Sequence, residues 1–181
     1  MPAQQIPGDS ISTAVVIPPS GLFRIIPTRS TISFTVPHLF GMRSVAGTMA
    51  VEEGDIVVSD TGQVKVAASA LTLSFDTGNP KRDKDIAAAK FLDADRNPRI
   101  TFRSKVATAG STAWSVKGTL DAAGYGAPLE LTVTGTVSPS TGELAINAVG
   151  KVDRYAHGIT KMKGMIGRYL EIQIHATARK A

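Results

Sequence analysis

Apolar and polar residues alternate along most of the chain, and this period of two is typical of β-strands with one buried face. In the segment 31–38, for example, Ile32, Phe34, Val36 and His38 share one face and mostly polar residues occupy the other. The same pattern predicts strands at 22–26, 45–51, 56–58, 63–75, 100–103, 114–120, 129–137, 144–148 and 170–177. Short turns separate these segments, among them a polar turn at 52–55, so we expect an antiparallel meander.

About eight such strands can close into a barrel, which removes both exposed edges of the sheet, and a two-sheet sandwich is the alternative. The inward positions favour a barrel, because they mix large side chains with small ones that leave room for a ligand. The large ones are Phe34, Met49, Phe75, Phe102, Trp114 and Leu131, and the small ones are Gly47, Ala68, Gly118, Gly135 and Ala148. We therefore predict an all-β fold, an extended eight-stranded antiparallel up-and-down barrel.

One long stretch, residues 77–102, interrupts the strand pattern. Asn79-Pro80 is a helix start signal, with Asn as the cap and Pro at the first helical position. Helix-forming residues follow, with Ile86 on their apolar side, and then the apolar pair Phe91-Leu92. We predict a short helix and crossover segment at about 80–96 that covers or borders one end of the barrel.

Length and composition indicate one domain. The chain has 181 residues, of which 43% are hydrophobic and 19% are charged, as in an ordinary protein with a single core. We predict a loose N-terminal arm at 1–21, which contains no Lys or Arg, and a single barrel domain at 22–181. The arm lacks the positive start and the long apolar run of a signal peptide, so we expect a cytoplasmic protein.

Several classes of function are disfavoured. The chain has no cysteine, and its three histidines are far apart in the sequence, which argues against a metal centre. No apolar run reaches the roughly 18 residues that a transmembrane helix needs. The net charge of +5 is spread along the chain, which indicates a solvated basic surface and no nucleic-acid partner.

Eight short motifs occur in an order that resembles the YceI-like polyisoprenoid-binding family, over about residues 22–178. They are Phe34-Thr-Val36-Pro-His38, Val45-Ala-Gly47, Thr77-Gly78-Asn79, Arg82-Asp83, Phe91-Leu92-Asp93, Asn97-Pro-Arg-Ile-Thr-Phe102, Gly118-Thr-Leu120 and Asp153-Arg-Tyr-Ala-His-Gly-Ile159. The chain departs from the family at 124–128, where relatives usually carry a Gly-Val/Ile-Thr-x-Pro turn.

The resemblance implies a lipocalin-like barrel that binds or carries a long isoprenoid chain, or a similar amphiphilic lipid, without catalysis and often as a homodimer. Family members are commonly periplasmic, unlike the location expected above. No cofactor is expected beyond the bound lipid. We predict these ligand-binding residues: Phe34, Val36, His38, Gly47, Met49, Phe75, Ile86, Phe91, Ile100, Phe102, Trp114, Gly118, Leu131, Arg154, Tyr155 and Ile159.

The lipid head could be a pyrophosphate or quinone-like group. Candidate cations for a pyrophosphate are Arg82, Arg154, Lys161 and Lys163, because charge-assisted hydrogen bonds hold phosphate oxygens well. In the structural alternative, the sequence neighbours Arg82-Asp83 and Asp153-Arg154 form ion pairs that hold the crossover to the barrel, and the two lysines are plain surface charges.

Two other functions stay open at this stage. An enzyme could use His38 or His157 as acid or base inside the barrel, although the sequence offers no Ser/His/Asp set and no paired catalytic carboxylates. A barrel could also hold haem through a histidine axial ligand. His38 itself is either a buried histidine bonded to the backbone or a polar group at the mouth of a cavity.

Overall fold

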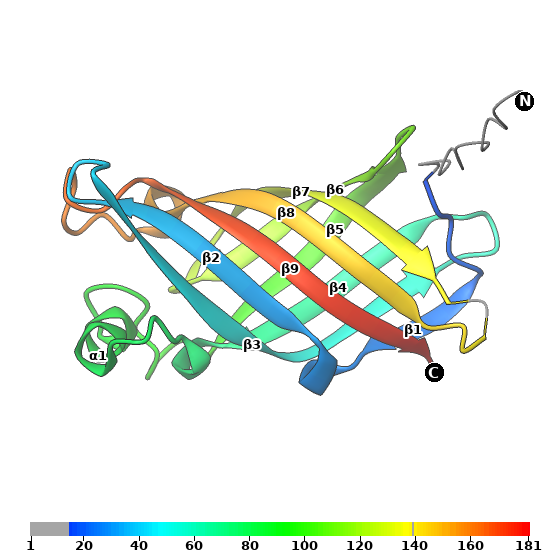
Figure 1. The fold of residues 1–181 in the computed structure, drawn as a ribbon, viewed down its shortest axis with the longest axis horizontal. Helices are drawn as coiled ribbons and strands as arrows, with labels where there is room; N and C mark the ends of the chain where they lie inside the picture. Colours follow the sequence, from blue (N-terminus) through cyan, green and yellow to red (C-terminus); the bar gives the residue numbers. More distant parts are fainter. Residues whose placement is uncertain (1–14, 139) are drawn as a thin grey trace, which may run out of the picture.

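Antiparallel strands form one continuous sheet that closes on itself in the computed structural model, which describes residues 15–138 and 140–181 (Figure 1). In order, the strands are β1 (Gly21–Ile25), β2 (Thr31–His38), β3 (Arg43–Val58), β4 (Val64–Leu71), β5 (Arg99–Ala109), β6 (Trp114–Ala122), β7 (Tyr125–Val137), β8 (Leu144–Asp153) and β9 (Tyr169–Lys180). From β2 onward each strand pairs with the next, and β9 pairs back with β2. The predicted all-β up-and-down barrel is confirmed.

The barrel has eight strand positions, because β1 and β2 share one of them. Both strands lie between β9 and β3: β1 pairs with the end of each, and β2 pairs further along the same two strands. A single 3₁₀ turn at Pro27–Arg29 separates β1 from β2. Pro27 removes a backbone donor, so the ladder is interrupted where the chain turns.

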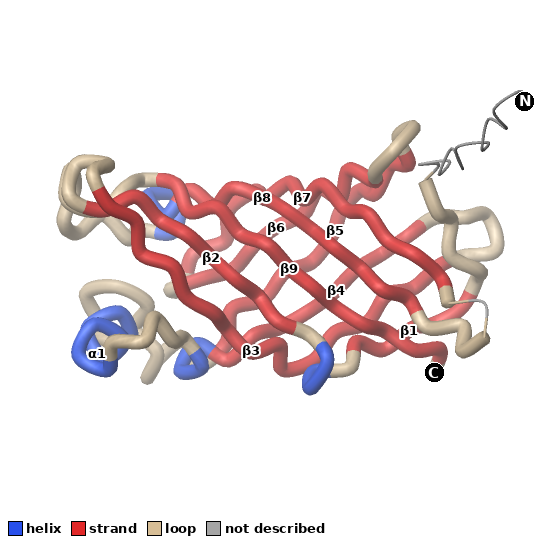
Figure 2. Tube along the Cα trace, in the orientation of Figure 1, coloured by secondary structure: helices blue, strands red, loops and turns tan. Residues whose placement is uncertain are grey.

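The predicted helix is present as α1 (Pro80–Ala87). Its first turn is capped by Asn79, whose side-chain oxygen accepts a hydrogen bond of 3.1 Å from the backbone N–H of Arg82. Thr72, at the start of the crossover, is bonded to its other end: the hydroxyl donates to the Asn97 carbonyl at 2.6 Å, and the backbone N–H donates to the Pro98 carbonyl. Figure 2 shows α1 at one end of the barrel, outside the strand wall.

Several strands are longer than predicted, such as β5 and β8, and two other differences change the course of the chain. The polar segment 52–55 is not a turn: it lies inside β3, which shifts register between Val51 and Glu53 and continues to Val58. Such a bulge lets a long strand bend without leaving the sheet. The strand predicted at 63–75 ends at Leu71, because residues 72–74 form a 3₁₀ turn that starts the crossover.

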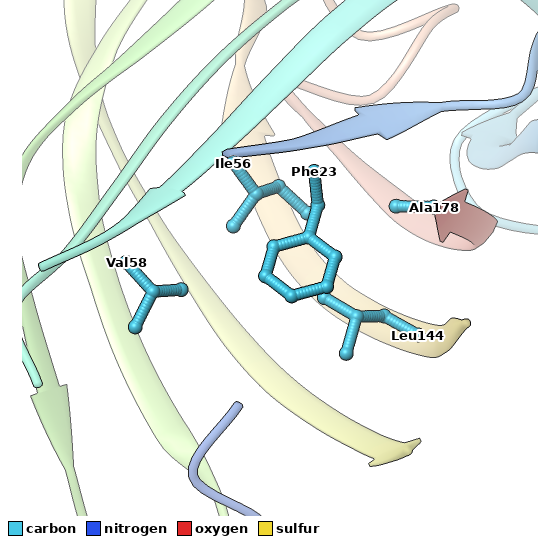
Figure 3. Close-up of a cluster of buried hydrophobic side chains, with 5 residues drawn as sticks. All are labelled: Phe23, Ile56, Val58, Leu144 and Ala178. Atoms are coloured by element: carbon cyan, nitrogen blue, oxygen red, sulfur yellow. The ribbon is translucent and has the colours of Figure 1, made fainter. Parts of the chain in front are cut away.

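The best-buried part of the core packs inside the barrel end that holds β1 and the last residues of β9 (Figure 1). Figure 3 shows the Phe23 ring pointing between the side chains of Ile56, Val58 and Leu144, with Ala178 beside them. Phe23 and Ala178 are completely buried. Hereafter this is the Phe23 end, and the opposite end, which carries α1, is the crossover end.

The predicted N-terminal arm lies mostly outside the described residues, which begin at residue 15. In its described part, the Val16 carbonyl accepts a hydrogen bond of 3.1 Å from the indole N–H of Trp114 at the start of β6. Gly21, which was predicted to belong to the arm, begins β1. None of the helices in the described ranges is long and apolar enough to cross a membrane.

Candidate functional site: a cavity inside the barrel

An apolar cavity of about 290 Å³ occupies the barrel interior. Residues from both ends of the barrel line this cavity: Ile56 and Leu144 lie in the Phe23 end, and Leu92 and Ile159 lie in the crossover end. This volume is close to the lower bound of about 300 Å³ that is common for small-molecule sites in proteins. The interior is therefore apolar and large enough to hold a small-molecule ligand.

Many of the residues predicted to bind ligand do lie on the cavity wall: Phe34, Met49, Phe75, Ile100, Phe102, Trp114, Leu131, Arg154 and Ile159. They come from β2, β3, β5, β6, β7 and the segments beside α1 and β8, so the barrel gathers residues that are far apart in the sequence. The rings of Phe34 and Phe75 stack with their centroids 4.3 Å apart, which joins the crossover to the barrel wall.

Other predicted residues lie off the cavity wall. Val36 and His38 pair with Val45 and Arg43 near the far tip of the β2–β3 hairpin, past the cavity. The crossover contributes Leu92 to the wall instead of the neighbouring Phe91, and Ile86 on α1 is also absent from it. Tyr155 has cations beside its ring: the Arg154 guanidinium is 4.8 Å and the Lys163 ammonium 5.1 Å from its centroid.

Gly47 and Gly118 make room for protein atoms, whereas the sequence had suggested room for ligand. A Cβ on Gly47 would lie 2.3 Å from the Phe34 ring and 2.5 Å from the Asp76 carbonyl oxygen. The bare backbone at Gly47 thus lets the crossover bond to β3, where Asp76 and Thr48 exchange two hydrogen bonds. A Cβ on Gly118 would lie 2.3 Å from the Arg103 carbonyl oxygen and 2.7 Å from the Phe102 ring.

Arg154 provides a buried cation at the crossover end of the cavity. Its side chain is on the cavity wall, and the residue is only 4% exposed. The guanidinium donates to four backbone carbonyl oxygens, those of Ile159, Lys161, Ile166 and Gly167, at 2.6 to 2.9 Å. Burial lowers the pKa of Arg154 from its usual high value. The group stays a cation, because arginine titrates far above neutral pH.

The acid next to Arg154 in the sequence is engaged elsewhere. Asp153 accepts two hydrogen bonds from Arg168, at 2.6 and 2.9 Å, and these lower the pKa of its carboxyl group. The structural alternative of an Asp153–Arg154 ion pair is therefore wrong. Arg82 likewise bonds to Thr77, through the hydroxyl at 2.7 Å and the carbonyl at 3.0 Å, and so holds its own loop.

Of the three histidines, only His157 lies on the cavity wall. It is 3% exposed, and its Nδ1 is 2.9 Å from the Tyr125 carbonyl oxygen. His175 instead contacts Asn147 on the outside of β8 and β9. His157 is not among the residues predicted to bind ligand, although it belongs to the motif 153–159, which also contains Arg154 and Ile159. Within the described ranges, no three His, Asp or Glu side chains are grouped as metal ligands would be.

Comparisons with known proteins agree with this architecture. Residues 23–178 match the family model described as the YceI-like domain. A UPF0312 protein of Serratia proteamaculans is 27% identical over 156 residues, which cover 83% of this chain and 81% of that protein.

Solved structures share the fold at low sequence identity. BcnA of Burkholderia cenocepacia has a TM-score of 0.72 at 17% identity, with 84% of this chain and 98% of that chain covered. A polyisoprenoid binding domain from Saccharophagus degradans, implicated in plant cell wall breakdown, has a TM-score of 0.67 at 12% identity, with coverage of 88% and 98%. The YCEI protein of Campylobacter jejuni has a TM-score of 0.58 at 19% identity, with coverage of 72% and 83%. By the extent of the family match, the chain belongs to the YceI-like family.

Proposed function

We propose that this protein binds or carries an isoprenoid chain, or a similar amphiphilic lipid, inside its barrel and performs no chemistry on it. The observation that carries the proposal is the apolar cavity, whose wall extends from the Phe23 end to Arg154 and His157 at the crossover end. Membership of the YceI-like family and the fold shared with a polyisoprenoid binding domain support the same ligand class.

The polar head of the lipid lies at the crossover end in this proposal. Arg154 places a buried positive charge there, and the carboxylate beside it in the sequence is bonded to Arg168. The contact with the Tyr125 carbonyl occupies Nδ1 of His157, which leaves Nε2 for a head group. A pyrophosphate or a quinone-like head could use these groups, while the tail fills the apolar remainder.

Tail length should control affinity until the cavity is full. Each buried methylene contributes up to about 0.8 kcal/mol by transfer from water. The realised gain is smaller, about 0.3 kcal/mol per heavy atom for larger ligands, because ordering the chain costs entropy. A series of isoprenoid alcohols of increasing length should therefore show rising affinity followed by a plateau, measured by displacement of a fluorescent lipid probe.

Native mass spectrometry of gently purified protein, followed by extraction of the ligand, tests the proposal directly. Ala148 is 5% exposed on the cavity wall, so Ala148→Phe should fill the cavity and lower lipid occupancy. Ala46 is exposed on β3, so Ala46→Phe is the matched control and should load as the wild type does. Protein without lipid from the native host, or a loaded and folded Ala148→Phe variant, would contradict the proposal.

The alternatives have their own tests. Conversion of candidate isoprenoids during incubation would identify an enzyme, and a Soret band on haem titration would identify a haem protein. The expected homodimer and the expected cytoplasmic location stay predictions, which light scattering and cell fractionation check.

A further inference from the structure

Two loops at the crossover end form one tip, made of residues 39–42 between β2 and β3, together with Arg43 at the start of β3, and residues 160–168 before β9. Figure 1 shows them side by side at the upper left, on the opposite side of this end from α1. They are bonded through the Leu39 N–H to the Met165 carbonyl at 2.7 Å, and through the Gly167 N–H to the Pro37 carbonyl at 2.8 Å. The tip is therefore one paired unit.

The tip exposes large apolar side chains. Phe40 is 74% exposed, Met42 77% and Met162 47%. Single exposed apolar residues are normal on proteins, but a group of them on two adjoining loops marks an interaction surface. Phe40 and Met162 also adopt left-handed backbone conformations, with φ of 56° and 55°. Such strain in residues other than glycine is concentrated at functional sites.

The charges around these side chains are mostly positive. The segments 31–51 and 154–170 contain no Asp or Glu, whereas Arg43, Lys161, Lys163 and Arg168 lie in the tip. A depression on the adjoining outer wall is lined by residues of the tip and by Lys151, and Glu171 is the acidic residue in its lining. Asp153, which directly precedes the acid-free segment 154–170, is bonded to Arg168. Apolar side chains surrounded by cations suit the headgroup region of an anionic bilayer, which attracts both.

The tip adjoins the cavity. Ile159, on the cavity wall, directly precedes the 160–168 loop, and Arg154 bonds the carbonyls of Ile159, Lys161 and Ile166 together. We propose that this cationic, apolar tip docks the protein on the surface of an anionic lipid bilayer. Phe40, Met42 and Met162 enter the headgroup region, and the crossover end of the cavity then lies close to the membrane.

Vesicle flotation with the full chain tests the proposal. The wild type should float with phosphatidylcholine vesicles that contain phosphatidylglycerol, much less with phosphatidylcholine alone, and less in high salt. Lys161→Gln with Lys163→Gln should lower partitioning roughly tenfold or more. The matched control, Lys65→Gln with Lys105→Gln on β4 and β5, changes the net charge equally and should lower it far less.

Insertion of the apolar residues needs a separate readout. The protein has one tryptophan, so Trp114→Phe provides a background in which Phe40→Trp reports on the tip. The control is Val57→Trp, at an exposed position beside β1 in the Phe23 end. On vesicles, only the tryptophan at position 40 should show a blue shift of its fluorescence emission and quenching by brominated lipids. Phe40→Asn with Met42→Gln should reduce flotation, and asparagine tolerates the left-handed backbone at position 40.

Several outcomes would overturn the proposal: no flotation, equal flotation with neutral vesicles, or equal shifts of the fluorescence emission at positions 40 and 57. Self-association that the tip variants abolish, without any vesicle binding, would assign the surface to a second copy of the chain. Vesicle binding and lipid loading of the cavity are measured separately. A protein that does not bind vesicles can still carry lipid in its cavity, and a protein without lipid in its cavity can still bind vesicles.

Discussion

Replacing Arg154 by lysine should destabilise the protein far more than the same change at Arg168. The Arg154 guanidinium bonds four carbonyl oxygens at 2.6 to 2.9 Å while only 4% of the residue is exposed. A lysine ammonium has three donors at a single point and cannot match the fork that arginine presents. At least one of the four carbonyls should therefore lose its charged partner.

The magnitude follows from those bonds. A hydrogen bond to a charged group contributes about 1.5 to 3 kcal/mol, so losing even one of them should cost at least about 1.5 kcal/mol. Total stability is typically about 5 to 15 kcal/mol, so the change is a large fraction of it. Arg168, whose side chain is 50% exposed in its pair with Asp153, should tolerate lysine with little change.

Urea unfolding provides the assay, with fluorescence of the only tryptophan, Trp114, as the probe of the barrel. Hydrogen exchange should also show faster amide exchange in the 159–168 segment of Arg154→Lys, because the guanidinium holds that segment. A free energy of unfolding for Arg154→Lys within about 1 kcal/mol of the wild type, or an equal loss in Arg168→Lys, would refute this role of Arg154.

Three further predictions concern the barrel frame. Gly118→Ala places a Cβ 2.3 Å from the Arg103 carbonyl oxygen and should lower the free energy of unfolding by about 1 to 3 kcal/mol, measured by thermal unfolding. An unchanged midpoint temperature would show that β5 and β6 can move apart without cost. Thr72→Val removes the hydroxyl bonded to Asn97 at 2.6 Å and should cost about 1 kcal/mol in urea unfolding, with faster exchange in the crossover. The hydrogen bond from Arg99 lowers the pKa of Glu52 below its usual value of 4.5. The stability that the Glu52–Arg99 pair contributes is therefore complete above about pH 4.5, and it is lost as the pH falls through the lowered pKa of Glu52 in the folded protein. Arg99→Gln should therefore lose less stability than the wild type between about pH 6 and pH 3 in denaturant titrations.

The barrel was predictable because its strands keep a strict alternation with one buried face. In β7, Leu129 and Leu131 are buried and their neighbour Glu130 is exposed, as the pattern predicts. The helix start was predictable for a similarly local reason, since Asn79 caps the turn that Pro80 begins. Both signals depend on residues close together in the chain.

The sequence prediction failed where distant contacts decide the structure. The segment 52–55 reads as a turn, but Glu52 accepts bonds from Ser69 and Arg99, and these side chains keep it within the sheet. The space expected at Gly118 is filled by the Phe102 ring and by the backbone of Arg103, both on the preceding strand β5. Similarly, the tip could not be predicted, because it forms only where the β2–β3 loop lies beside the loop before β9, and these loops are far apart in the sequence.

Closure of the barrel also has a consequence for the order of folding. The final pairing joins β2 to β9, for example Phe34 to Ile172, and these strands lie near opposite ends of the sequence. Contacts so distant along the chain carry a large loop-closure entropy and slow folding. During synthesis, β2 and β3 can form a hairpin early, but the interior stays open along one seam until β9 has left the ribosome. A hydrophobic ligand present at that moment could enter through the seam, before either end of the finished barrel exists.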